Sequence, residues 1–212
     1  MGPRDRRLKE RGETRAMILD AARGLFAASG SEAVTMRKIA EEVGYTPMAI
    51  YSYFRDKDAL LRALCDADFA ALRSSVARIA RGADPIERLR RMGRAYADFA
   101  LGHPNHYRLM FMNPPPWPPA DAPPAGAGRP ERDTYRFMRS AVEDALAAGR
   151  FRRELRDPDL LAQTIWGGVH GVIALHLALA GDPWVDWRPV RTAVRLMIDA
   201  LVRGLGAEGE HT

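Results

Sequence analysis

The sequence predicts an all-α protein, and three observations support that fold class. Apolar residues recur three and four positions apart in one stretch of the chain after another, which places them on one face of a helix. Helix-capping residues, glycines and prolines separate these stretches, where helices are expected to begin and end. From Leu160 to Gly181 no residue is charged, as expected for a helix that is buried all round.

The composition is that of a globular chain. Its 212 residues, 47% of them hydrophobic, suffice for one large domain or two small ones. The single cysteine, Cys65, excludes an intramolecular disulfide framework and fits a reducing cytoplasm, and no signal peptide is recognised. The net charge of +5 is modest for a nucleic-acid-binding protein.

Residues 1–13 are polar, and we expect them to form a flexible basic arm. They combine several basic side chains with Asp5, Glu10 and Glu13, and they contain too little apolar surface to order themselves. A mobile arm of this kind can reach phosphates or a minor groove, although the acidic residues dilute its charge. The basic residues are Arg4, Arg6, Arg7, Lys9 and Arg11.

The first helix is predicted over residues 14–29, with Gly30 as its stop. Residues 34–57 then predict two short helices joined by a tight turn. Thr35 caps the first of them, and Gly44 ends it because glycine enters the left-handed conformation without a Cβ penalty. Thr46 and Pro47 open the second, expected over 47–54. This is the helix-turn-helix pattern, whose second helix lies in the DNA major groove.

The residues of this stretch also resemble the TetR family of bacterial transcriptional regulators. The shared pattern is T-x-x-x-I-A-x-x-x-G-Y-T-x-x-x-I-Y-x-Y-F-x-x-K-x-x-L-L, which begins at Thr35, and I-L-D-A-A-x-x-L-F-A-x-x-G, which begins at Ile18, resembles the family as well. The departures are Thr46, where Ser is commoner, and Pro47 directly after it.

The resemblance implies a three-helix bundle with the helix-turn-helix at residues 14–60. A larger helical effector-binding and dimerisation domain would follow at 61–207, with a disordered tail at 208–212. The implied function is a ligand-responsive repressor that binds a palindromic DNA operator as a dimer and is released by a small apolar or aromatic effector. A helical protein-interaction module without DNA binding and a small all-α enzyme are the alternatives.

The resemblance also assigns roles to residues of the helix-turn-helix. Thr35, Tyr51 and Lys57 match family positions that contact phosphates. Arg37 is the one residue here that can bond guanine bidentately, whereas Met48 and Ala49 offer only apolar contact. Packing under the turn is the other role considered for Tyr51, and one ring can serve both roles. The predicted DNA-binding residues are Thr35, Arg37, Thr46, Pro47, Met48, Ala49, Tyr51, Tyr53 and Lys57.

Further helices are predicted after Asp56 or Asp58 to about residue 80, and over 86–101, 105–112, 131–148, 158–181 and 189–205. The proline-rich segment 113–130 cannot form a helix, so we expect a mobile loop, with a polyproline ligand as the alternative. The helices near 158–181 and 189–205 are predicted to pair with those of a second copy. The uncharged run approaches the length of a membrane span, but Gln163, His170 and His176 argue against that reading.

Aromatic and methionine side chains of the C-terminal helices are candidates for an effector pocket, with plain core packing as the alternative. Trp166, His170 and Gly171 also resemble a W-x-x-x-H-G element of one TetR-family subclass. The candidates are Met92, Tyr96, Phe99, Tyr107, Met110, Phe111, Phe137, Met138, Trp166 and His170.

No catalytic or cofactor motif is recognised, and no metal or cofactor is expected. The sequence has no Gly-rich phosphate loop, G-x-S-x-G or H-E-x-x-H motif. His103 and His106 are close enough in sequence to share a metal, but Pro104 lies between them and no cysteine is near, so a capping or surface role is expected.

Overall fold

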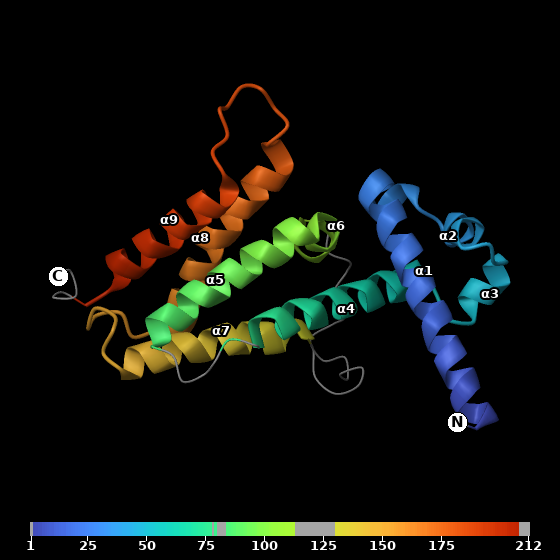
Figure 1. The fold of residues 1–212 in the computed structure, drawn as a ribbon, viewed down its shortest axis with the longest axis horizontal. Coiled ribbons are helices and arrows are strands. Elements are labelled where there is room, and N and C mark those ends of the chain that lie inside the picture. The colour runs from blue at the N-terminus through green and yellow to red at the C-terminus, as the bar shows by residue number, and fades with distance from the viewer. Residues whose placement is uncertain (1, 78, 80–83, 113–129, 208–212) are drawn as a thin grey trace. The chain divides into compact units, whose positions relative to one another are not determined.

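A computed structural model describes residues 2–77, 79, 84–112 and 130–207 and confirms the all-α fold class (Figure 1). The described residues form no strand, only an isolated bridge between Phe151 and Gly206. The predicted loop at 113–130, apart from Pro130, and the tail at 208–212 lie outside the described residues. The elements are α1 (Pro3–Ala33), α2 (Met36–Glu42), α3 (Pro47–Tyr51), α4 (Lys57–Ala77), α5 (Pro85–Gly102), α6 (Pro104–Tyr107), the π-helical η1 (Arg108–Met112), α7 (Pro130–Ala147), α8 (Pro158–Leu179) and α9 (Val190–Leu205).

The chain divides into two compact units, and α4 contributes residues to both. The first unit comprises residues 1–69 and 105–124, and the second comprises residues 70–104 and 125–212. The first unit therefore takes up the short segment with α6 and η1, which lies far along the sequence from α1, α2 and α3.

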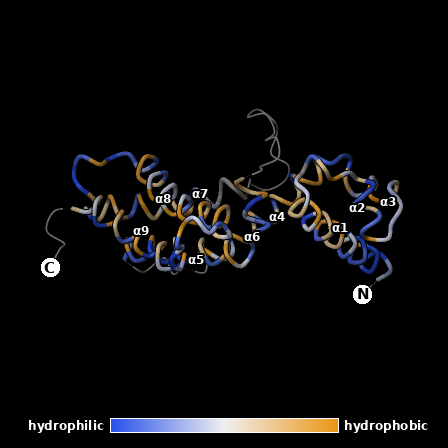
Figure 2. The backbone as a smooth tube through the Cα atoms, turned by 90° about the horizontal axis from the view of Figure 1, so that it is seen from above, coloured by the Kyte–Doolittle hydropathy of each residue, from blue (hydrophilic) through white to orange (hydrophobic). Residues whose placement is uncertain are grey.

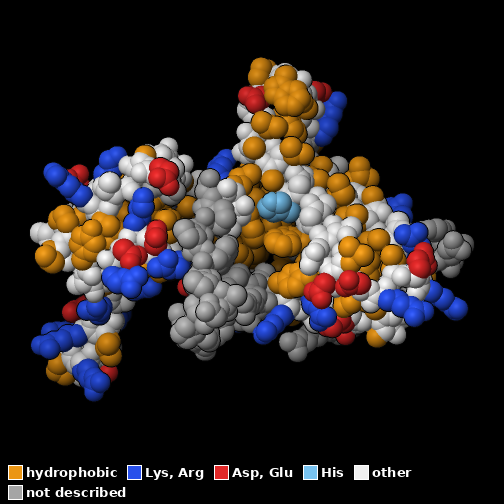
Figure 3. Space-filling view, turned by 180° about the vertical axis from the view of Figure 1, so that it is seen from behind, with side chains coloured by type: hydrophobic (Ala, Val, Ile, Leu, Met, Phe, Trp, Pro, Cys, Tyr) orange, Lys and Arg blue, Asp and Glu red, His pale blue; other side chains and the backbone are white. Residues whose placement is uncertain are grey.

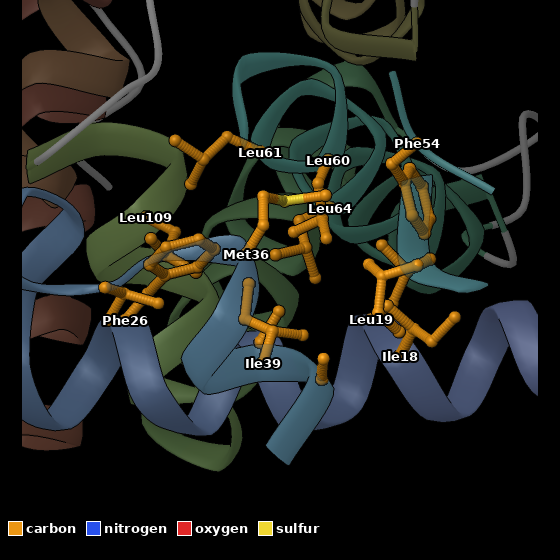
Figure 4. Close-up of a cluster of buried hydrophobic side chains, with 14 residues drawn as sticks. Ile18, Leu19, Phe26, Met36, Ile39, Phe54, Leu60, Leu61, Leu64 and Leu109 are labelled. Atoms are coloured by element: carbon orange, nitrogen blue, oxygen red, sulfur yellow. The ribbon is translucent and has the colours of Figure 1, made fainter. Parts of the chain in front are cut away.

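The first unit has one hydrophobic core, to which four helices and η1 contribute (Figure 4). The stripe predicted for the first helix is buried, with Ile18 and Ala22 at 0% exposure and Phe26 at 3%. Cys65 is buried as well, and its Sγ lies 3.7 Å from the carbonyl oxygen of Leu109. The labelled core residues are Ile18, Leu19, Phe26, Met36, Ile39, Phe54, Leu60, Leu61, Leu64 and Leu109.

The prediction of a flexible arm at residues 1–13 is wrong where the structure describes it, because α1 begins at Pro3. Asp5 accepts a hydrogen bond from the Gly2 backbone N–H at 3.0 Å, which closes the first turn. Two ion pairs at i,i+4 spacing, which is the spacing that stabilises a helix surface, follow along these turns. Figure 2 shows these turns as hydrophilic, so they carry no apolar stripe that would predict a helix.

Three other boundaries differ from the prediction. Gly30 interrupts the helical geometry at φ 74° as expected, but helix resumes after it as far as Ala33. The second helix of the helix-turn-helix ends at Tyr51 instead of Phe54, and the Ser52 hydroxyl there donates to the Ala49 carbonyl at 2.7 Å. The helix predicted over 105–112 is α6 followed by η1.

In the second unit, α5, α7, α8 and α9 pack against one another. Glycine permits close approach at two places, since a Cβ at Gly93 would lie 2.4 Å from Ile198 Cδ1 and one at Gly168 would lie 2.7 Å from Leu201 Cδ1. Arg88, a buried charge on α5, is neutralised by a hydrogen-bonded ion pair with Asp144 of α7.

Candidate nucleic-acid interface

The turn between α2 and α3 is built as its residue types predict. The Thr35 hydroxyl accepts a hydrogen bond from the Lys38 N–H at 3.2 Å, and the Thr46 hydroxyl accepts one from the Ala49 N–H at 3.3 Å. Gly44 has a φ of 71°, the left-handed conformation that ends α2. Both predicted N-caps and the predicted glycine stop are thus confirmed.

Helix α3 has only five residues, too few to be stable alone, so packing must hold it in place. On its inner side Ile50 is 0% exposed. At its C-terminal end, Arg11 of α1 donates to the Ser52 carbonyl at 2.9 Å and stacks 4.9 Å from the Tyr53 ring centroid. These contacts join residues 41 and 42 positions apart, and no local pattern in the sequence predicts them.

The outer side of α3 is exposed, with Met48 at 78% and Tyr51 at 49% exposure. Tyr51 is about half exposed, so part of its side chain is available to a ligand while the rest is covered by the protein. Arg37 on α2 is exposed and pairs with Glu41 at 3.0 Å. The other predicted DNA-binding residues lie in the same unit, with Thr35, Thr46 and Pro47 exposed and Ala49, Tyr53 and Lys57 partly buried.

The start of α4 adds charge next to α3. Asp56 caps this helix by accepting the Ala59 N–H at 2.7 Å, and this hydrogen bond, together with the Arg55 guanidinium, lowers the pKa of the Asp56 carboxyl. The carboxylate is thereby held in its charged form beside Arg55, and Lys57 is the first residue of α4.

Three of the predicted effector-pocket residues meet in the second unit. Tyr96 of α5 lies with its hydroxyl 3.0 Å from Nδ1 of His170 on α8, and the Trp166 indole N–H donates to the same hydroxyl oxygen at 3.2 Å. Burial lowers the pKa of the His170 imidazole, which favours the neutral ring. We therefore assign Nδ1 as the acceptor of the Tyr96 O–H, which gives a chain of hydrogen bonds from Trp166 through Tyr96 to His170.

The other candidates are divided between the units. Met92 and Phe99 are buried on α5, and Phe137 and Met138 are partly buried on α7, all in the second unit. Tyr107, Met110 and Phe111 belong to the first unit. There the Phe111 ring packs edge-on against Phe69 at 5.5 Å and lies 5.0 Å from the Tyr107 ring.

The two histidines considered for a metal have other neighbours. His103 follows α5 and its ring lies 5.2 Å from Phe99, whereas His106 Nδ1 lies 2.8 Å from Asp68 Oδ1. Within the parts of the chain that the structure describes, no three His, Cys, Asp or Glu side chains cluster as metal ligands.

Two family descriptions match this chain. "Bacterial regulatory proteins, tetR family" matches residues 18–64, which hold the helix-turn-helix, and "Tetracyclin repressor-like, C-terminal domain" matches residues 89–201. The chain belongs to the TetR family. TetR family proteins are transcriptional regulators and not enzymes, and the same holds for this chain.

Individual TetR family members resemble the chain over different lengths. The HTH-type transcriptional repressor Rv1474c of Mycobacterium tuberculosis is 44% identical over 54 residues, which is 26% of this chain and 29% of that protein. The chain therefore aligns with less than a third of that relative's length.

Two solved structures share the fold over most of the chain. The TetR family regulator PfmR from Thermus thermophilus has a TM-score of 0.68 at 21% identity, over 88% of this chain and 97% of that one. AibR, solved in complex with isovaleryl coenzyme A and operator DNA, has a TM-score of 0.65 at 20% identity, over 91% and 97%.

Proposed function

We propose that this TetR family protein is a transcriptional repressor that inserts α3 into the major groove of a palindromic operator. One observation carries the proposal: α3 is fixed on its inner side by Ile50 and presents Met48 and Tyr51 outward. A side chain that is exposed on a rigidly held helix is what reading a groove requires. The similarity to a repressor from Mycobacterium tuberculosis supports repression over activation.

Two classes of DNA contact are proposed, from the family resemblance and from the chemistry of the side chains. Thr35, Tyr51 and Lys57 contact phosphates and set the register, because hydroxyls, phenols and ammonium groups bond phosphate oxygens without reading sequence. Arg37 reads guanine, and Met48 and Ala49 supply apolar contact, for example to a thymine methyl. Thr46, Pro47 and Tyr53 complete the edge of the surface.

We propose that the protein acts as a homodimer through α8 and α9. Leu160 and Leu175 on α8 are 57% and 54% exposed, and Leu196 on α9 is 69% exposed. Hydrophobic side chains also gather at the turn between these helices (Figure 3), where Trp184 is 69% exposed. Exposed apolar side chains gathered on neighbouring helices are typical of a protein–protein interface.

A second copy fits this surface better than a membrane does. Helix α8 has the length and hydropathy of a membrane span, and 28% of its most apolar stretch is buried within one copy. It nevertheless packs against α9, α5 and α7 and carries Gln163, His170 and His176. A second copy would cover the exposed leucines, and its α3 helix would bind the second half of a palindromic operator. We propose that this dimer is a cytoplasmic regulator.

The effector is proposed to be a small apolar or aromatic molecule that binds beside Tyr96, Trp166 and His170. This network joins aromatic rings to a few oriented polar groups, which is the usual lining of a ligand site. AibR, a structural neighbour, was solved with an acyl thioester. To release DNA, the effector must bind more tightly to a dimer whose α3 helices are spaced wrongly for the operator than to one whose α3 helices fit it. Helix α4 contributes residues to both units, so it can transmit this change of spacing.

Selection of bound sequences from random duplex DNA at low ionic strength tests the function. We expect a palindromic sequence to be enriched, and we expect enrichment to fall when an effective ligand is added. Short-chain acyl-coenzyme A esters and aromatic acids are suitable first probes. A purified protein that is monomeric, or that enriches no duplex at low salt, would refute the proposal.

A further inference from the structure

The first turns of α1 carry a stripe of arginines. Arg4, Arg7, Arg11 and Arg15 are spaced three, four and four residues apart, so they lie on one face of the helix. All four precede the buried part of α1, which begins with Ile18. Figure 3 shows Lys and Arg side chains gathered at this N-terminal end.

Asp5 accepts a hydrogen bond from the Gly2 N–H, and the other two acidic residues of this segment lie away from the arginine stripe. Glu10 pairs with Arg6 at 3.5 Å, and Glu13 pairs with Lys9 at 3.7 Å. At about 100° per residue these four residues occupy the side opposite the stripe. Residues 2–15 carry six basic and three acidic side chains, and the two ion pairs leave one face of the helix neutralised and the other cationic.

The cationic face is continuous with the end of α3. Arg11 bonds the Ser52 carbonyl and stacks on Tyr53, and Arg15 lies 5.0 Å from the centroid of the Phe54 ring. Two members of the stripe thus contact residues 52–54, which directly follow the recognition helix. The other two, Arg4 and Arg7, are exposed, and the described residues provide no hydrogen bond or ion pair to them.

We infer that Arg4 and Arg7 form a second DNA contact, in which the first turns of α1 bind the phosphate backbone beside the groove that α3 enters. Guanidinium groups in a row on a helix match the repeating charge of that backbone. Because the cationic face continues to the end of α3, DNA is favoured over an acidic protein as its binding partner. Arg11 and Arg15 serve as positioning residues for α3. The inference rests on the proposed DNA binding and adds a site to it.

A pair of double variants tests the contact in the full-length protein. Arg4→Gln/Arg7→Gln removes two charges from the cationic face, and Arg6→Gln/Lys9→Gln removes two from the neutralised face. Glutamine favours helix in both cases. We expect the first variant to lower the slope of log K against log salt by about 1.8 for each protomer, because each phosphate that is no longer neutralised reduces the slope by about 0.9. The control should keep the slope of the parent protein.

A one-residue insertion distinguishes a contact made by an ordered helical face from one made by a flexible arm. One alanine added between Lys9 and Glu10 turns Arg4 and Arg7 by about 100° relative to Arg11 and leaves the charge unchanged. We expect the insertion to reproduce the reduction in slope.

The inference is overturned if the insertion binds like the parent, or if the two double variants weaken binding equally. A parent protein that binds no duplex contradicts the proposed function itself, whereas binding that is indifferent to Arg4 and Arg7 contradicts only the inference.

Discussion

At the residue scale, Arg37 is held by a contact that DNA can replace. Its guanidinium pairs with Glu41 while 80% of the Arg37 side chain and 62% of the Glu41 side chain remain exposed. Ion pairs this exposed contribute little to stability, so exchanging the carboxylate for a guanine edge costs little. The pair keeps the arginine on α2 and leaves it available.

Arg37→Ala and Lys57→Ala should therefore affect DNA binding differently. Removal of a bidentate guanine contact is expected to relax preference at one base position by about 1–3 kcal/mol. Removal of a phosphate contact is expected to weaken binding to every sequence and to lower the salt slope by about 1. Titration of cognate and scrambled duplexes at several salt concentrations measures both. Equal weakening on the two duplexes for Arg37→Ala would refute its role in base reading.

His170 provides a residue-scale prediction on pH. Burial lowers the pKa of its imidazole in the folded protein below the ordinary value of 6.5, so between these two values the unfolded chain binds more protons. The free energy of unfolding should then rise with pH through this range and fall as the solution is acidified.

Urea unfolding at fixed protein concentration, measured between about pH 5 and pH 8, gives the size of that dependence. His170→Gln keeps an acceptor for the Tyr96 hydroxyl but cannot titrate, so its stability should change less over the same range. A variant with the full pH dependence would show that other groups cause it.

At the element scale, the sequence predicts most helices because their ends carry local chemistry. Thr35, Gly44 and Thr46 each perform the role that their residue type indicates, and Asp157 accepts the backbone N–H of Asp159 at 2.9 Å to start α8. The first turns of α1 were not predicted because their stabilising contacts are polar and include a tie to Ser52. The π-helical η1 likewise has no signature in local spacing.

Gly44→Ala should destabilise the helix-turn-helix through the backbone alone. Apart from Gly44 itself and its two chain neighbours, no heavy atom lies within 4 Å of a Cβ at this position, but its φ of 71° is costly for an L-residue, by about 1–2 kcal/mol. Gly24→Ala is a matched control, since Gly24 lies inside α1 with equally open space, and the change should stabilise by about 0.5–1 kcal/mol. Thermal unfolding of both variants tests the pair. A Gly44→Ala protein as stable as the parent would contradict the strain argument.

At the scale of the whole molecule, the grouping of the candidate site residues depends on tertiary packing. The DNA-binding candidates lie together because they are close in sequence, within residues 35–57. The effector candidates do not, because Tyr107, Met110 and Phe111 join the first unit while Tyr96, Trp166 and His170 meet in the second. Apolar character alone cannot assign a side chain to one core or the other.

The proposed dimer gives the prediction at this scale. Leu175→Glu and Leu196→Glu each place a charge on an exposed apolar face, where a partner would have to desolvate it. We expect the dimer dissociation constant to rise about tenfold or more in sedimentation, with loss of binding to a palindromic duplex. Met17→Glu changes an exposed apolar residue of α1 in the other unit and should leave the dimer intact. Unchanged sedimentation of both leucine variants would exclude this interface.

The shielded thiol of Cys65 has a practical consequence. It is the single cysteine of the chain and is 1% exposed, so it should not react with thiol reagents in the folded protein. A cysteine introduced at Met48, on the outer side of α3, would then carry a spin label or fluorophore at one defined point in each protomer. Spectroscopic distances between the two labels, with and without a candidate effector, would measure directly how far the two recognition helices move apart.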